Sequence, residues 1–245
     1  MKIYLRNKEN FNKETIEFYE NNFDIVEEKD ADIIMINDFE SIETDKIVAC
    51  NSTGKDHIKA KEIISLRGED LSDLTAVAEL TLGMAIYCTR IFKKEEVRGK
   101  TLGIIGYGRI GKQFAYYANE LGMKFDYYEK EDLDKKLEYV LQNSDIISLH
   151  ITSDESNRNF FKREHFEKMK DGAIFLNSAR PWLVNQEDFY WALENKLSGA
   201  WVDFNMPFVE NLVTTPHIGG GTFESKKKSE LILANKLKKL YGTTR

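Results

Sequence analysis

The pattern of hydrophobic positions is one of short apolar runs that alternate with amphipathic stretches along the chain. In the first third, apolar runs predict buried strands at residues 3–5, 32–36, 46–49 and 63–66, and residues 12–21 have the spacing of a helix. Alternation of this kind is typical of parallel sheets that carry helices on both faces. The first segment is therefore predicted to form an α/β domain.

A second alternating series begins at Thr101, after a long predicted helix at residues 71–92 and a charged connector. Its apolar runs predict six strands, at residues 101–105, 125–128, 146–150, 173–176, 200–203 and 212–214. Six strands with helical crossovers is the count of a dinucleotide-binding domain. The final stretch, residues 223–240, is an amphipathic helix that we expect to pack back on the first domain.

Composition narrows the class of protein. The chain has 245 residues and a formal net charge of −6, from 35 basic and 41 acidic side chains. The longest block of like charge is Lys226 to Lys228, which would contact an anion or form a solvated helix face, so no nucleic-acid partner is predicted. Two cysteines among apolar neighbours indicate free thiols. The polar start and the lack of an apolar run of roughly 18 residues predict a soluble, cytoplasmic protein without a membrane span. We predict no metal site.

The segment 106–111 has the GxGxxG pattern of a phosphate-binding turn, and its context supports that interpretation. An apolar strand leads into Gly106, which permits a tight turn, and Gly108 lets the backbone approach a pyrophosphate. Gly111 allows close packing of helix on strand. The amides of Arg109 and Ile110 would begin the next helix, where free N–H groups and the helix dipole favour an anion.

Glu129 ends the next strand, 18 residues after Gly111. An acidic residue at this place accepts hydrogen bonds from the adenosine ribose, and its charge repels the 2′-phosphate of NADP. The sequence therefore predicts NAD as the cofactor. The alternative is a solvent-facing glutamate at a strand end.

Four segments, residues 99–111, 144–150, 177–180 and 215–220, resemble motifs of the D-isomer-specific 2-hydroxyacid dehydrogenases, in the same order and at compatible spacing. In that family they are the dinucleotide signature, the following strand, the catalytic-arginine segment and the catalytic-histidine segment. Residues 51–57 resemble the family's loop that holds the substrate carboxylate.

The resemblance implies a fold and a division of the chain. It implies a Rossmann NAD-binding domain with a six-stranded parallel sheet, at residues 77–222. A smaller, flavodoxin-like α/β substrate domain is split between residues 1–76 and 223–245. The active site would lie in the cleft between them. The family's dimer region is the connector at residues 93–98, which is shorter here, and a homodimer is expected.

The resemblance also assigns site residues. Arg180 and His217 are the catalytic pair, and Thr53, Gly54 and Lys55 with Arg180 bind the substrate carboxylate. The expected NAD contacts are Thr53, Gly106, Gly108, Arg109, Ile110, Gly111, Glu129, Ile151, Ser178, Ala179, Arg180, Asp203, His217, Gly219 and Gly220.

The residue types fit these roles. A guanidinium is permanently charged and grips a carboxylate in a forked geometry, which suits Arg180. Imidazole titrates near neutral pH, which suits His217 as the acid and base. The alternatives are an exposed, salt-bridged arginine and a structural histidine. Asp203 would hold the nicotinamide carboxamide or cap a nearby amide.

Three positions depart from the family's pattern. Met206 stands where the family has the glutamate that pairs with the catalytic histidine, so we expect His217 to be less well oriented and to lose its proton more easily. Glu210 would supply the missing carboxylate or is an exposed loop residue. Pro181 follows Arg180 and favours an extended backbone there. Lys55 would suit a dicarboxylate or phosphorylated substrate, or is a surface lysine.

The predicted function is that of an NAD-dependent oxidoreductase, which interconverts a small D-2-hydroxy acid and its 2-keto acid by hydride transfer. The expected substrates are of the phosphoglycerate, glycerate or glyoxylate type. The alternative is a catalytically weak or inactive NAD(H)-binding regulator or sensor on the same fold. The substitution at Met206 favours this alternative, and the presence of Arg180 and His217 opposes it.

Overall fold

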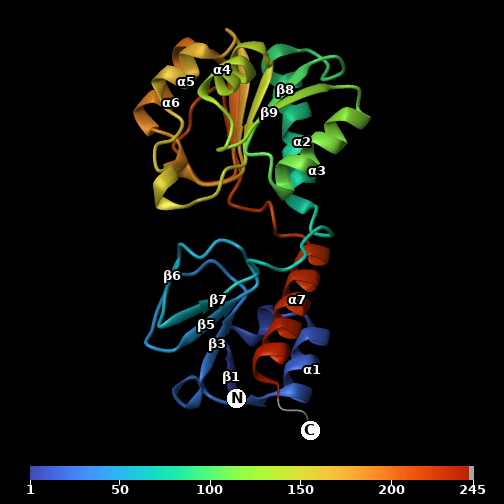
Figure 1. Ribbon diagram of the computed structural model, residues 1–245, viewed down its shortest axis with the longest axis vertical. Helices are drawn as coiled ribbons and strands as arrows, with labels where there is room; N and C mark the ends of the chain where they lie inside the picture. The colour runs from blue at the N-terminus through green and yellow to red at the C-terminus, as the bar shows by residue number, and fades with distance from the viewer. Residues whose placement is uncertain (243–245) are drawn as a thin grey trace. The chain divides into compact units, whose positions relative to one another are not determined.

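The computed structural model describes residues 1–242, and the chain forms two compact units (Figure 1). The first consists of Met1–Leu74 with the segment that begins at Gly221, and the second is Thr75–Gly220. The predicted boundaries, after residues 76 and 222, lie two residues further along the chain. Within residues 1–242 no helix combines the length and apolarity needed to cross a membrane.

The first unit is built on a five-stranded, entirely parallel sheet in the order β2-β1-β3-β5-β7. The strands are β1 (Lys2–Leu5), β2 (Asp24–Ile25), β3 (Ile33–Ile36), β5 (Ile47–Cys50) and β7 (Glu62–Ile64). Counted along the chain this is the 2-1-3-4-5 order of the flavodoxin-like fold, as predicted. All four residues of β3 are buried, because the central strand is covered on both faces.

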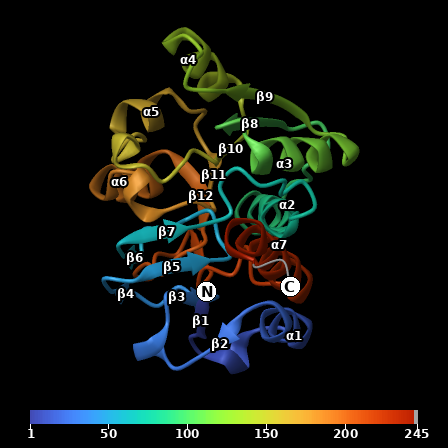
Figure 2. The same cartoon turned by 60° about the horizontal axis from the view of Figure 1, so that its bottom comes forward.

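Among residues 1–242, helices cover one face of this sheet and not the other. Figure 2 shows α1 (Lys13–Asn22) beside α7 (Phe223–Tyr241), and the two pack against each other and on the sheet. On the other face Ile34 and Val48 pack in a separate apolar cluster with Ile58 of the short strand β6 (Ile58–Lys59). Strand β6 pairs with β4 (Ile42–Glu43). The expectation of helices on both faces is therefore wrong for this unit, because short strands replace the crossover helices.

The second unit contains a six-stranded parallel sheet, which confirms the predicted count. Its strands are β8 (Thr101–Ile105), β9 (Lys124–Tyr128), β10 (Ile146–Leu149), β11 (Ala173–Asn177), β12 (Leu197–Val202) and β13 (Leu212–Thr214). The order is β9-β8-β10-β11-β12-β13, so β9 is an edge strand of the sheet formed by the described residues. Strand β9 lies on one side of β8 in the sheet, and β10, which follows β9 in the chain, lies on the other side of β8. The two sides diverge between β8 and β10, where ligands bind in open α/β sheets.

Helices cover both faces of this second sheet (Figure 1). One face carries α2 (Ala76–Cys88) and α3 (Arg109–Glu120), and the other carries α4 (Asp134–Asn143), α5 (Arg163–Lys168) and α6 (Gln186–Asn195). Short 3₁₀ turns occur at Lys8–Asn10, Glu28–Asp30, Glu155–Asn157 and Pro181–Leu183.

The long helix predicted at residues 71–92 is shorter and less regular than expected. The α-helix begins at Ala76, and its last turn, Thr89–Lys93, is π-helical. Leu71 has the apolar character of a helix face, but it is buried in the core of the first unit. The apolar pattern at the start of this segment therefore reflects packing of the first unit.

Candidate active site

The carboxyl ends of the second sheet's parallel strands meet at one edge, and the predicted site residues of this unit begin the loops there. Gly106 follows β8, Glu129 follows β9, Ile151 comes after β10, Ser178 to Arg180 follow β11, Asp203 follows β12 and His217 comes after β13. The parallel sheet thus brings to one edge residues that are up to 111 positions apart in the sequence, Gly106 and His217.

The glycine turn passes close to the end of β10. Gly106 has φ +98°, and a Cβ there would lie 2.8 Å from the His150 carbonyl carbon and from the Ile151 nitrogen. At Gly111 a Cβ would meet the Gly106 carbonyl oxygen. Gly108 differs, because no atom lies within 4 Å of where its Cβ would be and its φ is −74°. The protein's own packing does not require glycine at position 108, so the open space fits a ligand that approaches the backbone.

The helix α3 begins directly after this turn, with Gly108 as its N-cap. Its first amides, including those of Arg109 and Ile110, precede the first intrahelical hydrogen bonds and point out of the N-terminus. No acidic side chain lies in the first turn. These residues fit the pyrophosphate of a dinucleotide.

Glu129 begins the turn after β9 and is half-buried. Its N–H donates to Asp132 Oδ2 at 2.8 Å, and Asp132 also pairs with Lys136 at 2.8 Å. The hydrogen bond from Lys136 holds the pKa of the Asp132 carboxyl below its usual range. The hydrogen bond to Asp132 thus fixes the backbone of Glu129 at the start of this turn.

His150 joins the ends of β10 and β11. Its Nε2 lies 2.8 Å from Ser148 Oγ, its Nδ1 lies 3.4 Å from Ser178 Oγ, and its ring packs edge-on against Phe114. Burial of the ring lowers the pKa of His150 to about 4. The imidazole is therefore neutral at pH 7 and supports the strand ends without adding charge.

The neutral His150 predicts a loss of stability in acid. The unfolded chain takes up this proton near pH 6.5 and the folded chain only near pH 4, so folding is disfavoured as the pH falls between these values. The loss reaches up to about 3 kcal/mol below pH 4. Urea unfolding at pH 7.5 and pH 5, compared with a His150→Gln variant, measures this contribution. An identical pH dependence in the two proteins would contradict it.

The Arg180 segment is held by Asn177, which is fully buried at the end of β11. The Asn177 side chain accepts from the Ala179 N–H at 2.9 Å and donates to the Arg180 carbonyl at 3.0 Å. The backbone of Arg180 is extended (φ −146°, ψ 150°), as Pro181 predicts. The guanidinium donates to the Ala179 carbonyl at 3.0 Å and lies 6.0 Å from the Trp182 ring centroid.

The His217 ring has a defined orientation. Its Nδ1 lies 3.1 Å from the Asp203 backbone carbonyl oxygen. A carbonyl oxygen can only accept, so Nδ1 carries a hydrogen, and the neutral ring has its lone pair on Nε2. The backbone of His217 is in the left-handed region (φ 56°), which is uncommon for a residue other than glycine.

The Asp203 carboxylate is buried, with 1% of the residue exposed, and it binds the histidine loop. Oδ1 accepts from Thr215 Oγ1 at 2.7 Å and from the Ile218 N–H at 2.9 Å, and Oδ2 accepts from the Gly219 N–H at 2.8 Å. Of the two roles expected for Asp203, the structure displays the capping of nearby amides. Contact with a nicotinamide stays a prediction.

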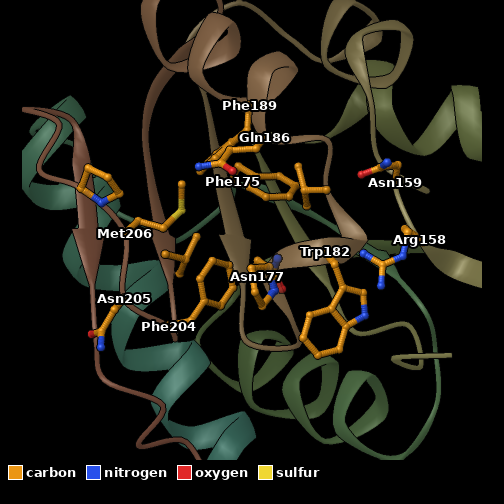
Figure 3. A pocket seen from close by; sticks show the side chains of 14 residues that line it. Arg158, Asn159, Phe175, Asn177, Trp182, Gln186, Phe189, Phe204, Asn205 and Met206 are labelled. Carbon is orange, nitrogen blue, oxygen red and sulfur yellow. The ribbon is translucent and has the colours of Figure 1, made fainter. Parts of the chain in front are cut away.

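Met206 and Glu210 lie on the loop that follows Asp203. Glu210 is exposed, and the structure gives His217 Nδ1 the Asp203 carbonyl as its partner instead. The hypothesis that Glu210 replaces the missing carboxylate gains no support. Met206 lines a pocket of about 400 Å³ together with Trp182 and Phe204 (Figure 3). The pocket borders the Arg180 segment through Asn177, whose side chain also lines it.

The remaining predicted site residues belong to the first unit, in the loop after β5. Ser52 Oγ donates to the Gly54 carbonyl at 2.6 Å, and Arg67 Nε donates to the Thr53 carbonyl at 3.4 Å. Lys55 is exposed, as the surface-lysine alternative expects. The loop thus has hydrogen-bonded backbone carbonyls and the cationic side chain of Lys55, and Arg67 contacts it from the segment after β7.

Comparison with known proteins assigns the chain to a family. Residues 86–219 match the family model described as the D-isomer specific 2-hydroxyacid dehydrogenase, NAD binding domain. Over 238 residues the chain is 33% identical to a hydroxypyruvate reductase from Thermotoga maritima, a match that covers 80% of this chain and 78% of that protein. The chain belongs to the D-isomer specific 2-hydroxyacid dehydrogenase family.

Other relatives in this family agree, although the match covers less of them. The chain is 30% identical to a D-3-phosphoglycerate dehydrogenase from Methanocaldococcus jannaschii, over 86% of this chain but 50% of that protein. The chain thus spans about half the length of several curated relatives. The fold resembles that of the NAD⁺-bound 3-phosphoglycerate dehydrogenase from Entamoeba histolytica, with a TM-score of 0.80, 20% identity and coverage of 100% and 97%. The predictions of the family, the fold class and NAD as cofactor are confirmed.

Three residues that build this candidate site were not among the predicted ones. Asn177 holds the arginine segment, and Thr215 and Trp201 hold the histidine loop: Trp201 Nε1 donates to Thr215 Oγ1 at 3.0 Å. Asn177 and Thr215 lie inside the quoted motifs, so their polar side chains next to Arg180 and His217 were a usable signal. Nothing in the sequence indicated that the Trp201 indole would reach Thr215.

Among residues 1–242 no group of three or more His, Cys, Asp or Glu side chains is arranged to hold a metal.

Proposed function

We propose that this protein catalyses the NAD-dependent interconversion of a small D-2-hydroxy acid and its 2-keto acid, with Arg180 and His217 as catalytic residues. The observation that carries the proposal is the position of the hydrogen on the His217 ring. Its Nδ1 donates to the Asp203 carbonyl, so in the neutral ring the lone pair lies on Nε2, which is the atom we propose for proton exchange. His217 lies in a loop at the same edge of the sheet as the extended Arg180 and the glycine turn of the NAD-binding domain.

Each residue has a distinct role in this proposal. Bound NADH supplies the hydride for reduction of the keto acid. The Arg180 guanidinium binds the carboxylate and polarises the keto oxygen, because a fixed positive charge stabilises the developing alkoxide. Protonated His217 donates the Nε2 proton to that oxygen, and in the reverse direction neutral Nε2 accepts it. The contacts proposed for NAD are those expected from the sequence, with Gly108 and the amides of Arg109 and Ile110 at the pyrophosphate.

The substrate is proposed to be of the phosphoglycerate, glycerate or glyoxylate type. The backbone of Thr53, Gly54 and Lys55 would hold its carboxylate, and the first unit would be the substrate domain. Support comes from the ordered loop around Gly54 and from the names of the relatives, a hydroxypyruvate reductase and a D-3-phosphoglycerate dehydrogenase.

The test is turnover with NADH and a panel of keto acids that contains glyoxylate, hydroxypyruvate, phosphohydroxypyruvate and pyruvate. Absorbance of the reduced nicotinamide follows the reaction, and calorimetry with NADH measures binding separately. Turnover of one of these acids that is lost in His217→Gln supports the proposal. Tight NADH binding with no turnover of any acid would favour the alternative, an NAD(H)-binding sensor.

Glu129 is expected to set the preference for NAD over NADP. Replacement by glutamine removes a negative charge from the place where the 2′-phosphate would lie, and a unit charge at about 4 Å is worth roughly 1 to 4 kcal/mol. The ratio of kcat/KM for NADH to that for NADPH should therefore fall by about 10- to 100-fold. Glu131→Gln, on the same turn, is the matched control and should leave the ratio unchanged. An equal fall in both variants would indicate a general charge effect.

We also propose a homodimer that acts in the cytoplasm. Large apolar side chains are exposed on neighbouring helices: Tyr87 of α2, Ile91 of the following π-turn and Tyr116 of α3 are 48%, 53% and 63% exposed. Exposed apolar side chains of this size favour a subunit contact. The buried thiols of Cys50 and Cys88 suit a reducing compartment. Sedimentation at micromolar concentration should give a dimer, and Ile91→Lys a monomer.

A further inference from the structure

We infer that Trp201, Thr215 and Asp203 form a hydrogen-bonded chain that positions His217 and fixes which ring nitrogen carries the hydrogen. The inference rests on the proposed function, because His217 is a catalytic residue only if the reaction occurs.

The chain begins in the core and ends at the catalytic loop. The Trp201 side chain is fully buried, and its indole N–H donates to Thr215 Oγ1 at 3.0 Å. This donation leaves the Thr215 hydroxyl hydrogen for Asp203 Oδ1, at 2.7 Å. An indole N–H can only donate, so the direction of both hydrogen bonds is fixed.

Asp203 then holds His217 in two ways. Its backbone carbonyl accepts from His217 Nδ1, and its carboxylate accepts from the next two amides, those of Ile218 and Gly219. The left-handed backbone at His217 turns these successive N–H groups toward one anion, a geometry that recurs in backbone anion sites. A non-glycine residue held in this region carries a conformational cost, which the contacts to Asp203 offset.

The carboxylate has little freedom to move. Asp203 is 1% exposed, and a Cβ at Gly219 would lie 2.9 Å from its Oδ2 and 3.4 Å from Val77 Cγ2. A buried carboxylate is tolerated when donors satisfy it, and three donors do so here. If Thr215 lost its hydroxyl, Oδ1 would keep only the Ile218 amide among the hydrogen bonds described. The carboxylate could then rotate, and the carbonyl that holds Nδ1 would shift with it.

The contacts at this site therefore predict a ring with its hydrogen on Nδ1, donated to a backbone carbonyl. A neighbouring carboxylate is the usual orienting group for a catalytic histidine. Here the Asp203 backbone carbonyl accepts from Nδ1, and Trp201 and Thr215 hold the carboxylate of the same residue. The carbonyl contact orients the ring through a neutral acceptor at Nδ1.

The test compares Thr215→Val, which removes the hydroxyl at nearly constant volume, with Thr215→Ser, which keeps it. Trp201→Phe removes the indole donor together with part of the ring volume. Nitrogen-15 spectra of the histidine rings, assigned with His217→Gln, report the hydrogen position on His217 directly. Steady-state kinetics give kcat and the KM for NADH, and thermal unfolding shows that each variant is folded.

The wild type and Thr215→Ser should have the His217 hydrogen on Nδ1. In Thr215→Val the spectrum should change to a mixture of both forms, and kcat should fall by about 10- to 100-fold with the KM for NADH changed less than about twofold. Trp201→Phe should change both readouts in the same direction and by less. If Thr215→Val does not fold, Trp201→Phe and Thr215→Ala provide the same comparison.

Two results would overturn the inference. One is a His217 ring that keeps its hydrogen on Nδ1 in every folded variant, with kcat unchanged. The other is a loss of kcat in Thr215→Ser equal to that in Thr215→Val. Failure of the proposed function gives a different result, because a wild type that reduces no keto acid would still display the change in ring hydrogen on loss of the Thr215 hydroxyl.

Discussion

Replacing Arg180 by methionine should lower kcat/KM for keto-acid reduction by about 10³-fold and leave the affinity for NADH within a few-fold. A forked guanidinium makes two hydrogen bonds to charged or developing-charge oxygens, each worth roughly 1.5 to 3 kcal/mol. A loss of about 4 kcal/mol corresponds to this factor. Methionine keeps the length and the apolar stem, and the Asn177 contacts to the backbone at Ala179 and Arg180 do not involve the substituted side chain.

Two further variants separate charge, geometry and general damage. Arg180→Lys keeps the charge but not the fork, so its kcat/KM should lie between those of the wild type and Arg180→Met. Arg163→Met is the matched control, because Arg163 stacks on the Trp191 ring at 3.7 Å and pairs with Asp188. Its turnover should equal that of the wild type. Equal activity of wild type and Arg180→Met would remove Arg180 from the proposed mechanism.

The second large effect is expected at Gly108. Substitution by alanine should weaken NADH binding by about 10- to 100-fold without lowering stability. A Cβ at this position meets no atom of the protein within 4 Å, and φ is −74°, so alanine fits the unliganded chain. The methyl group occupies the space that the pyrophosphate would use, which excludes close approach of the backbone. Calorimetric titration with NADH and urea unfolding measure the two quantities.

Gly106→Ala is the matched control, because alanine at this position overlaps with the protein itself and not with the space left for a ligand. Its Cβ would lie 2.8 Å from three backbone atoms of His150 and Ile151, and φ is +98°. The strain and the overlap should each cost about 1 to 3 kcal/mol, so this variant should lose stability together with binding. If Gly108→Ala lowers stability as much as Gly106→Ala, the open space at Gly108 does not belong to a ligand.

The sequence predicted those elements whose determining residues are close together along the chain. The strand β8 and the start of α3 were predicted because an apolar run, three glycines and a helical period occur together within twenty residues. The same is true of the extended Arg180, whose conformation follows from Pro181 next to it. In the first unit the prediction of helices on both faces was wrong. Short strands such as β4 and β6, of two residues each, leave no periodic signal.

The sequence by itself determined that the chain has a nucleotide-binding turn at residues 106–111 and a family resemblance with Arg180 and His217 as its catalytic pair. The tertiary structure decided how His217 is held. Asp203 and Thr215 lie 12 positions apart, and Trp201 meets Thr215 only because β12 and β13 pair in parallel and end at one edge. A hydrogen-bond partner depends on register and on which face a side chain takes, and neither follows from residue type. For that reason Met206 suggested an unsupported histidine, whereas the folded chain supports it through a backbone carbonyl.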